Sequence, residues 1–483
     1  MSNNDILEKY KSIPPNEEEI KKLFSHSKHL AIQSFDTLSD PTKISPLTPE
    51  IMSRQATINI GTIGHVTHGK TTLVGCITRN GRRRRKKYRT EIEGNISVFL
   101  GGYANTKLYK CPKCPDLEAY RAYGADKEDK PKCEKCGEYL ELLRHKSFFD
   151  CPGHDLLMHT MLNSASVMDA ALLLIAANCQ CPQPETREHL VAVQNMDLKN
   201  IIIVQNKIDL IKEEEAKKNY QQIKTFVKGT KATNSPIIPI SAQYEYNIDA
   251  VIRYLCDLPI PKRDFISPPK FIITRSFDIN KPGTEYDELK GGVVRGTLIR
   301  GILRVGDIIE IRPGELIKDN NGKYKVKPLY SRIISLEAAQ TNDLLYAVPG
   351  GLIGVGLQLD PYLTRKNKLV GNILGYPGKL PNIYTSIIVE THLMVRYVGL
   401  TEKDKNTSYI DEIKFKEELL ISIGSNSISS IVNDISGDNK DIVKFSLSQP
   451  VCVEIGENVT LSRKVEKWRL IGWGKVLDGG ETI

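Results

Sequence analysis

The stretch GHVTHGKT, residues 64–71, constrains the fold of this chain more than any other part of its sequence. It fits the pattern GxxxxGK[ST], follows the apolar run TINIGTIG and precedes a segment compatible with a helix. In such a context the glycines let backbone N–H groups close around phosphates at the N-terminus of a helix. The stretch therefore predicts a phosphate-binding loop between a buried strand and a helix.

The chemistry of this loop assigns roles to its side chains. We expect Lys70 to neutralise the β and γ phosphates of a nucleotide and the Thr71 hydroxyl to bind Mg²⁺. Thr67 is expected to contribute its backbone only. The candidate residues of the loop are Thr67, His68, Gly69, Lys70, Thr71 and Thr72.

Three further short elements follow in the order expected of a nucleotide-binding α/β domain. The segments DCPG (150–153), NKID (206–209) and SAQ (241–243) each end a candidate strand, and open α/β sheets bind ligands at the carboxyl ends of their strands. Apolar runs such as DAALLLIAAN and NIIIVQNKID alternate with longer stretches, which predicts a parallel sheet. The candidate residues here are Asp150, Gly153, Asn206, Lys207, Asp209, Ser241, Ala242 and Gln243.

Single residues in these elements indicate the base and the reaction. Asp209 can accept paired hydrogen bonds from the guanine N1–H and 2-amino group, which favours GTP over ATP. Asp150 brings a carboxylate near the metal, and Gly153 has an amide that can sense a γ-phosphate. His154 follows directly and can orient an attacking water, since positioning is most of what phosphoryl transfer requires of protein groups. We therefore expect a GTPase with His154 and Lys70 as catalytic residues.

Two CxxC pairs predict a metal site inside this domain. CPKC (111–114) and CEKC (133–136) flank a polar segment, and two such turns can present four thiolates tetrahedrally to Zn²⁺. A metal-free thiol pair is the alternative; a redox role is disfavoured because neither pair opens a helix after a thioredoxin-like strand. We interpret the zinc as structural. The candidate ligands are Cys111, Cys114, Cys133 and Cys136.

The chain changes character beyond a Pro-rich linker at 259–270. Short, Gly-punctuated, β-branched segments follow and predict antiparallel barrels, with a break at GYPGKLPN (375–382). The polar residues at the beginning are expected to form a loosely ordered extension. The expected organisation is an N-terminal extension (1–52), an α/β P-loop GTPase domain (53–262) with a zinc-knuckle insert (109–140), and two antiparallel β-barrel domains (268–377 and 383–483).

Charge and hydropathy narrow the class of protein. No run of about 18 apolar residues occurs, and the polar N-terminus is no signal peptide, so we expect a cytoplasmic protein without membrane contact. The formal net charge is +9, and the run GRRRRKKYR (81–89) supplies seven of those positive charges. The basic excess is therefore mostly one local feature. This run fits a solvated charge run, a nuclear-localisation patch or an RNA-facing part of a nucleotide switch.

The chain resembles the gamma subunit of eukaryotic and archaeal translation initiation factor 2 from about residue 53 to 480. The resemblance is carried by GHVTHGKTT, DCPGHDLLMHTML, NKIDL and SAQYEYNIDAV, by the cysteine-knuckle insert, and by PGGLIGVG and WRLIGWG. It implies GTP or GDP, Mg²⁺ and Zn²⁺ as cofactors. It also implies that the GTP form binds initiator methionyl-tRNA and, with alpha and beta subunits, carries it to the small ribosomal subunit. GTPase-activating and nucleotide-exchange factors are further implied partners.

The segment before the knuckles departs from the pattern of this family, which commonly has an Asn/Gly-Ile/Met-Thr-Ile stretch there. This chain has Asn95-Ile-Ser97-Val, so Ser97 is the expected second Mg²⁺ ligand and Thr90 a weaker candidate. Two alternatives share the GTPase core: an elongation or selenocysteine-tRNA delivery factor, and the GTPase subunit of a sulfate-activating enzyme. The knuckles and the C-terminal segments favour the initiation factor.

Overall fold

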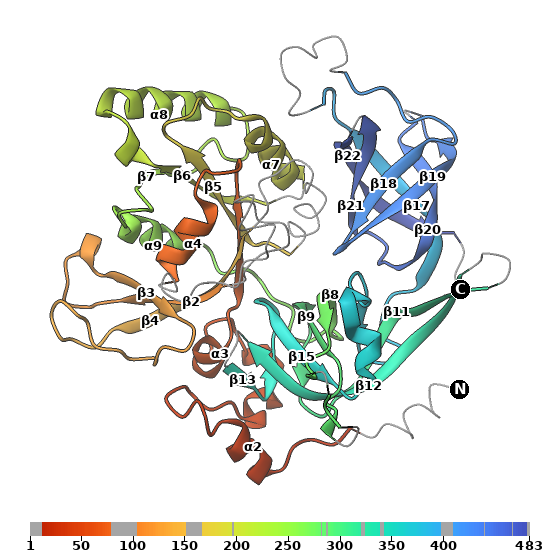
Figure 1. The fold of residues 1–483 in the computed structure, drawn as a ribbon, viewed down its shortest axis with the longest axis horizontal. Coiled ribbons are helices and arrows are strands. Elements are labelled where there is room, and N and C mark those ends of the chain that lie inside the picture. The colour runs from red at the N-terminus through yellow and green to blue at the C-terminus, as the bar shows by residue number, and fades with distance from the viewer. Residues whose placement is uncertain are drawn as a thin grey trace.

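The structure is a computed structural model in which an α/β domain and two β-barrels lie side by side (Figure 1). It describes residues 12–78, 104–150, 167–195, 198–281, 283–285, 288–319, 324–338, 342–397, 409–438, 440–465 and 467–480. Within these ranges no helix is both long enough and apolar enough to span a membrane.

The first domain is built on a seven-stranded sheet with the order β3-β2-β4-β1-β5-β6-β7. Strands β4, β1, β5, β6 and β7 run parallel, whereas β2 pairs antiparallel with β4 and β3, so the insert extends one edge of the sheet. The strands are β1 (Ile58–Ile63), β2 (Ala104–Lys110), β3 (Tyr120–Gly124), β4 (Glu141–Asp150), β5 (Ala170–Ala176), β6 (Asn200–Asn206) and β7 (Ile237–Pro239). The helices are α4 (Lys70–Ile77), η3 (Asp116–Glu118), α7 (Pro184–Asn195), η5 (Ile208–Leu210), α8 (Glu213–Val227) and α9 (Ile248–Asp257).

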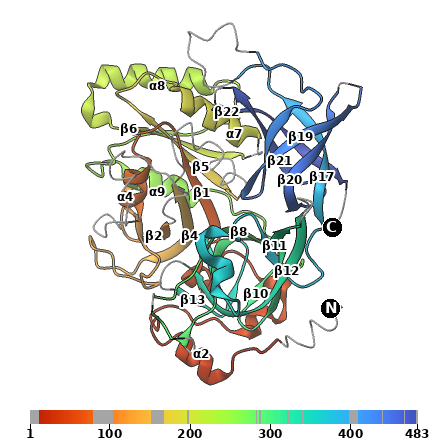
Figure 2. The same cartoon turned by 45° about the vertical axis from the view of Figure 1, so that its right-hand side comes forward.

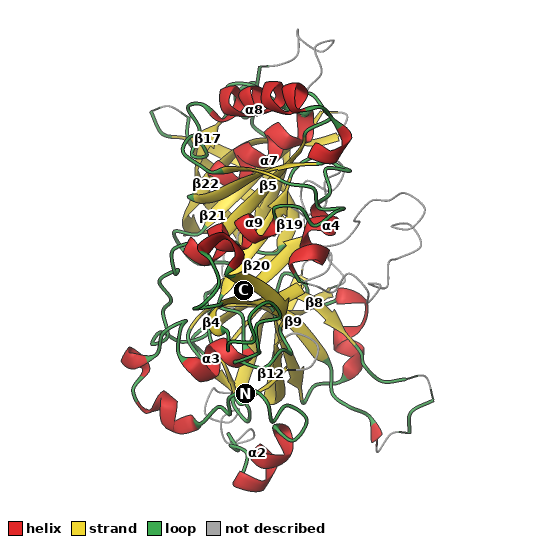
Figure 3. Cartoon of the chain, turned by 90° about the vertical axis from the view of Figure 1, so that its left-hand side faces the viewer, coloured by secondary structure: helices red, strands yellow, loops and turns green. Residues whose placement is uncertain are grey.

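Both faces of this sheet are covered by helices, which explains the continuous apolar run of β5. The odd-numbered residues from Ala171 to Ile175 pack with α7 and α8. The even-numbered residues from Ala170 to Leu174 pack with α4 and α9. In Figure 3, α7 and α8 accordingly lie above β5, and α4 and α9 lie below it. The carboxyl ends of the parallel strands are thereby left for the loops that follow them.

The two barrels are antiparallel and closed. The first is a ring of β11-β16-β8-β9-β15-β12 that closes by pairing of β12 with β11, and the second is a ring of β17-β20-β19-β18-β21-β22. The first contains β8 (Lys270–Phe277), β9 (Val293–Arg300), β10 (Leu303–Arg304), β11 (Ile308–Lys318), β12 (Tyr324–Ala338), β13 (Asn342–Leu344), β14 (Tyr346–Ala347), β15 (Ile353–Leu357), η7 (Pro361–Asn367) and β16 (Ile373–Gly375). The second contains β17 (Ile383–Leu393), β18 (Glu418–Ile423), β19 (Asn426–Ser436), β20 (Ile442–Cys452), β21 (Asn458–Val465) and β22 (Lys467–Gly479). The expected fold class is confirmed.

The N-terminal segment packs on the first barrel, so the expectation of a loosely ordered extension over 1–52 is wrong for residues 12–52. Phe24, Leu38 and Ile51 are buried against Tyr346 and its neighbours on the barrel. The polar composition hid this because the few apolar side chains find their partners hundreds of residues away in the sequence. The segment contains α2 (Glu17–Leu23), η1 (Phe35–Ser39), η2 (Pro41–Lys43) and α3 (Pro49–Arg54).

The barrel also closes onto the backbone that leads into β1. The Gln55 side-chain amide donates to the carbonyls of Val348 and Gly350, and its oxygen accepts from the Val348 N–H. Gly350 has a φ of 105°, and an added Cβ would lie 2.5 Å from the Thr57 carbonyl oxygen. Glycine is therefore required in the PGG segment because two backbones meet there.

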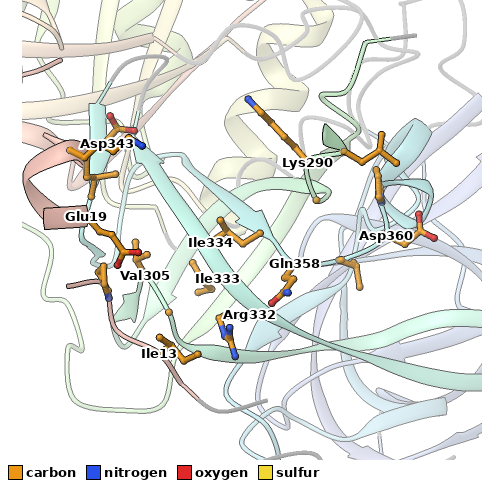
Figure 4. A pocket seen from close by; sticks show the side chains of 18 of the residues that line it. Ile13, Glu19, Lys290, Val305, Arg332, Ile333, Ile334, Asp343, Gln358 and Asp360 are labelled. Carbon is orange, nitrogen blue, oxygen red and sulfur yellow. The ribbon is translucent and has the colours of Figure 1, made fainter. Parts of the chain in front are cut away.

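A pocket opens between the N-terminal segment and the first barrel (Figure 4). Ile13 and Glu19 of the segment lie at one side of it, and Arg332 and Ile334 of β12 and Asp360 beside η7 contribute to the rest of its lining. Among the described residues that line this pocket, none belongs to the phosphate loop, to NKID or to SAQ. The pocket is therefore separate from the residues selected for nucleotide chemistry.

Two fully buried lysines lie on neighbouring strands of the sheet in different surroundings. Lys107 on β2 has its Nζ 2.8 Å from a carboxylate oxygen of Asp129. Lys146 on β4 donates to the carbonyl of Leu255 near the end of α9. Burial lowers the pKa of Lys146 to about 7. A buried ammonium that loses its hydration for a single neutral carbonyl destabilises the fold.

Replacing Lys146 by an apolar side chain should therefore stabilise the chain. The folded pKa of about 7 lies below the ordinary value of 10.5, so the penalty is complete below pH 7 and disappears as the pH rises towards 10.5. Lys146→Met should raise the midpoint of thermal unfolding. The free energy of unfolding should increase by about 2 kcal/mol at pH 6 and by less at pH 9.5. The control Lys107→Met should lower the midpoint, because Asp129 loses its cation. A Lys146→Met chain less stable than the parent at pH 6 would contradict this account.

Candidate functional site

The phosphate loop lies between β1 and α4, in the strand–loop–helix setting that its motif requires. The Nζ atom of Lys70 donates to the backbone carbonyls of Gly64 and His65, at 2.9 Å in each case. Lys70 is buried, whereas Thr71 and Thr72 in the first turn of α4 are exposed. The ammonium thus lies over the beginning of its own loop, and a hydroxyl is accessible at the helix N-terminus.

Close packing around the loop makes two of its glycines necessary. Gly64 and Gly69 have φ values of 131° and 93°. A Cβ added to Gly64 would lie 2.4 Å from the Leu174 carbonyl oxygen, and one added to Gly69 would lie 2.3 Å from Nδ2 of Asn206. Thr67 also has a positive φ, of 65°. The loop is therefore held in a conformation that side chains oppose, as is common where a backbone closes around a ligand.

Asn206 joins the phosphate loop to the SAQ element. Its Nδ2 donates to the His68 carbonyl at 2.9 Å, and its Oδ1 accepts from the Ala242 N–H at 3.0 Å. Asn206 is buried, so both bonds form away from water. Its side chain thus uses both ends of the amide to connect loops that follow three different strands.

The residues selected for base recognition lie around this connection. Asp209 is exposed in η5, directly after β6, and Gln243 is exposed after β7. Between them Ala242 is buried, and its carbonyl accepts from the Cys76 thiol of α4 at 2.9 Å. Burial raises the pKa of Cys76 to about 11, which keeps this thiol protonated as a donor. The Asp209 carboxylate is thus accessible, whereas Asn206, Ser241 and Ala242 beside it are buried.

The remaining predicted residues are placed only in part. Asp150 is the last residue of β4, where its backbone is paired with Thr62 of β1, and nothing is described of its side chain. Ser97, Gly153 and His154 lie outside the described residues, as does the basic run 81–89. The structure therefore brings together the phosphate loop, the end of β4, NKID and SAQ at one edge of the sheet.

The four knuckle cysteines lie close enough to hold one metal ion. Their Sγ atoms all lie within 4.8 Å of one another. Three of the Sγ–Sγ distances are 3.4 Å for Cys111 with Cys136, 3.7 Å for Cys114 with Cys136, and 3.8 Å for Cys114 with Cys133. Tetrahedral ligation with bonds of about 2.3 Å requires sulfur–sulfur distances of about 3.8 Å. The donor set therefore fits Zn²⁺.

Helix α7 contacts the phosphate loop through two residues, Glu185 and His189, that belong to none of the nucleotide-binding motifs. Nδ1 of His189 accepts a hydrogen bond from the Gly64 N–H at 3.0 Å, and the Glu185 carboxylate is hydrogen-bonded to Nδ1 of His65. Burial lowers the pKa of His189 to about 3, so this ring is neutral and its Nδ1 can accept. The sequence signal that could have indicated these contacts is the i, i+4 spacing of Glu185 and His189 on the helix that follows β5.

Two family models match this chain. The model described as Elongation factor Tu GTP binding domain matches residues 133–261. The model described as Initiation factor eIF2 gamma, C terminal, matches residues 385–476, within the second barrel. The two matches therefore fall on the nucleotide domain and on the C-terminal barrel.

Solved structures resemble this chain in fold. A bacterial selenocysteine-specific elongation factor, EF-Sec, gives a TM-score of 0.62 at 19% identity, covering 88% of this chain and 59% of that chain. This chain thus spans 59% of the length of the bacterial factor. The elongation factor SelB of Methanococcus maripaludis, in complex with a GTP analogue, gives 0.61 at 20% identity, covering 88% and 80%. At such identities the likeness shows the architecture alone.

Curated relatives are similar over almost their whole length. Eukaryotic translation initiation factor 2 subunit gamma of Schizosaccharomyces pombe is 53% identical over 444 residues, which cover 91% of this chain and 98% of that protein. Eukaryotic translation initiation factor 2 subunit 3 of Drosophila melanogaster is 50% identical, covering 92% and 93%. With identity at this level across all three domains, this chain belongs to the family of the gamma subunit of eukaryotic translation initiation factor 2, and it is a translational GTPase.

Proposed function

We propose that the GTP form of this chain binds initiator methionyl-tRNA and, together with alpha and beta subunits, delivers it to the small ribosomal subunit in the cytoplasm. Family membership makes the chain the GTP-binding subunit of initiation factor 2. The observation that carries the proposal is the 53% identity over 98% of a gamma subunit, since it includes both barrels as well as the nucleotide domain. GTPase-activating and nucleotide-exchange factors complete the proposed partners.

The proposed nucleotide site uses the residues gathered at the sheet edge. Lys70 and the loop amides hold the phosphates. In the complex, charged phosphate oxygens would replace the neutral carbonyls of Gly64 and His65 as hydrogen-bond acceptors for the Lys70 Nζ. Asp209 pairs with guanine, supported by Asn206 and the backbone of Ala242. The phosphate and base ends of the nucleotide are thus bound by loops that one buried amide connects.

The hydrolytic residues belong to the proposal as well. Thr71 and Ser97 would hold Mg²⁺, which neutralises charge on the phosphates when bound. Asp150 is proposed to support this ion. Gly153 would sense the γ-phosphate through its amide, and His154 would orient the attacking water. In this reaction the protein groups position and neutralise, and they form no covalent intermediate.

Filter binding tests the proposed function directly. Methionyl initiator tRNA should be retained by the chain, assembled with its alpha and beta subunits, more strongly in GTP than in GDP. A methionyl elongator tRNA serves as the matched control, because it carries the same amino acid on a different tRNA body. Equal retention of both tRNAs, or retention that ignores the nucleotide, would refute the proposal.

The variant Asp209→Asn extends this test to the base site. Asn presents a donor where Asp presents an acceptor, so it should disfavour guanine and accept xanthine. Initiator tRNA binding by this variant should then be supported by xanthosine triphosphate and lose its response to GTP. A variant that still responds to GTP as the parent does would remove Asp209 from the base site.

Zinc content and stability should depend together on the cysteine cluster. The parent chain should carry one zinc ion, and Cys133→Ser should lose it and lower the thermal midpoint, because the polar insert depends on the metal for its folding. Cys179→Ser is the control, since Cys179 lies outside the cluster. Metal analysis by inductively coupled plasma mass spectrometry measures the first effect. Full zinc occupancy in Cys133→Ser would contradict the assignment.

A further inference from the structure

Helix α7 lies between the phosphate loop and the second barrel, beside β22 in Figure 2. Two consecutive residues of this helix, Glu188 and His189, form hydrogen bonds with different parts of the molecule. Glu188 accepts from Nη1 of Arg469 on β22 at 2.7 Å, and His189 accepts from the Gly64 N–H at 3.0 Å. A single helical step thus separates a contact with the barrel from a contact with the phosphate loop.

The contact with the loop has two attachment points on the helix. Glu185 precedes His189 by four residues, so the two side chains lie on the same face of α7. They hold the first two residues of the loop, His65 through its ring and Gly64 through its N–H. Movement of α7 along or about its axis therefore changes the backbone at the beginning of the loop.

The same two loop residues hold the phosphate-binding lysine. The carbonyls of Gly64 and His65 both accept from Nζ of Lys70. Gly64 cannot yield towards the sheet, because the Leu174 carbonyl oxygen lies against it on that side. The orientation of this backbone is consequently determined by His189, Leu174 and Lys70 together. When a phosphate draws Lys70 away from these carbonyls, the α7 contacts and the Leu174 carbonyl still constrain the backbone.

The contact with the barrel is anchored in the core. Leu470, which follows Arg469 on β22, is buried in the same cluster as Leu190 and Val193 of α7 and Ile63 at the end of β1. The Arg469–Glu188 pair is itself largely shielded, with the two side chains 18% and 9% exposed. An ion pair in such surroundings is more costly to break than one at the surface.

We propose that α7 couples the seating of the second barrel to the affinity of the phosphate loop for nucleotide, with Glu188 bound to the barrel and His189 acting as a positioning residue for Gly64. The coupling rests on the proposed nucleotide site. It runs in both directions, because a barrel contact that alters nucleotide affinity is altered by nucleotide to the same extent. A partner that displaces the second barrel would thereby change the rate at which GDP leaves.

The dissociation rate of a fluorescent GDP analogue from the full chain tests the coupling. Arg469→Gln should change this rate about fivefold or more. Arg463→Gln is the matched control: Arg463 lies directly opposite Arg469 on β21, and its ion pair with Glu417 stays within the barrel. The control should change the rate less than about twofold, with thermal midpoints reporting any loss of folding in either variant.

Two further measurements separate coupling from general destabilisation. Reversing the pair, with Arg469→Glu and Glu188→Arg together, should restore the parent rate. In a background that carries both His189→Leu and Glu185→Ala, Arg469→Gln should have no further effect, since both contacts of α7 with the loop are then removed. Equal rates for Arg469→Gln and Arg463→Gln, additive effects in this background, or no rescue by the reversed pair would each overturn the coupling.

The parent chain distinguishes the two levels of the account. If it binds the GDP analogue and Arg469→Gln leaves the rate unchanged, the coupling is wrong and the nucleotide site stands. If the parent binds no GDP analogue, the proposed nucleotide site is wrong and the coupling falls with it.

Discussion

The buried amide of Asn206 is the interaction on which the nucleotide site depends. It stands at the end of β6, and it holds the phosphate loop by one atom and the SAQ backbone by the other. The Cys76 thiol of α4 also donates to the Ala242 carbonyl, so two side chains, Asn206 and Cys76, join the phosphate-loop region to the SAQ element. Losing either bond of the Asn206 amide would leave a buried polar group unpaired, at a cost of about 1–3 kcal/mol.

The contacts between the domains connect the nucleotide site to both barrels. One hydrophobic cluster contains Ile63 and Phe149 of the sheet together with Ile272 of the first barrel and Leu470 of the second. The strands that carry the nucleotide loops are therefore packed in a core to which all three domains contribute. Residues next to the phosphate loop are thus in direct packing contact with both barrels.

The residues that could be predicted from sequence are those with local signals. The glycines of the phosphate loop, the CxxC pairs and the strand ends before NKID and SAQ each have a pattern within a few residues. The missed features are long-range pairs: Gln55 and Val348 are separated by 293 positions and Arg469 and Glu188 by 281. The N-terminal segment was misjudged for the same reason, because its partner surface is formed by the barrel rather than by its own neighbours.

The affinity of Asn206→Ala for GDP is the most direct measurement of this account. The substitution removes both bonds of the amide and leaves Lys70, Thr71 and Asp209 in place. We predict a dissociation constant about 10- to 100-fold higher than that of the parent, with an unchanged circular dichroism spectrum. An Asn206→Ala chain that binds GDP within twofold of the parent would show that the phosphate loop and the base element are assembled independently of this residue.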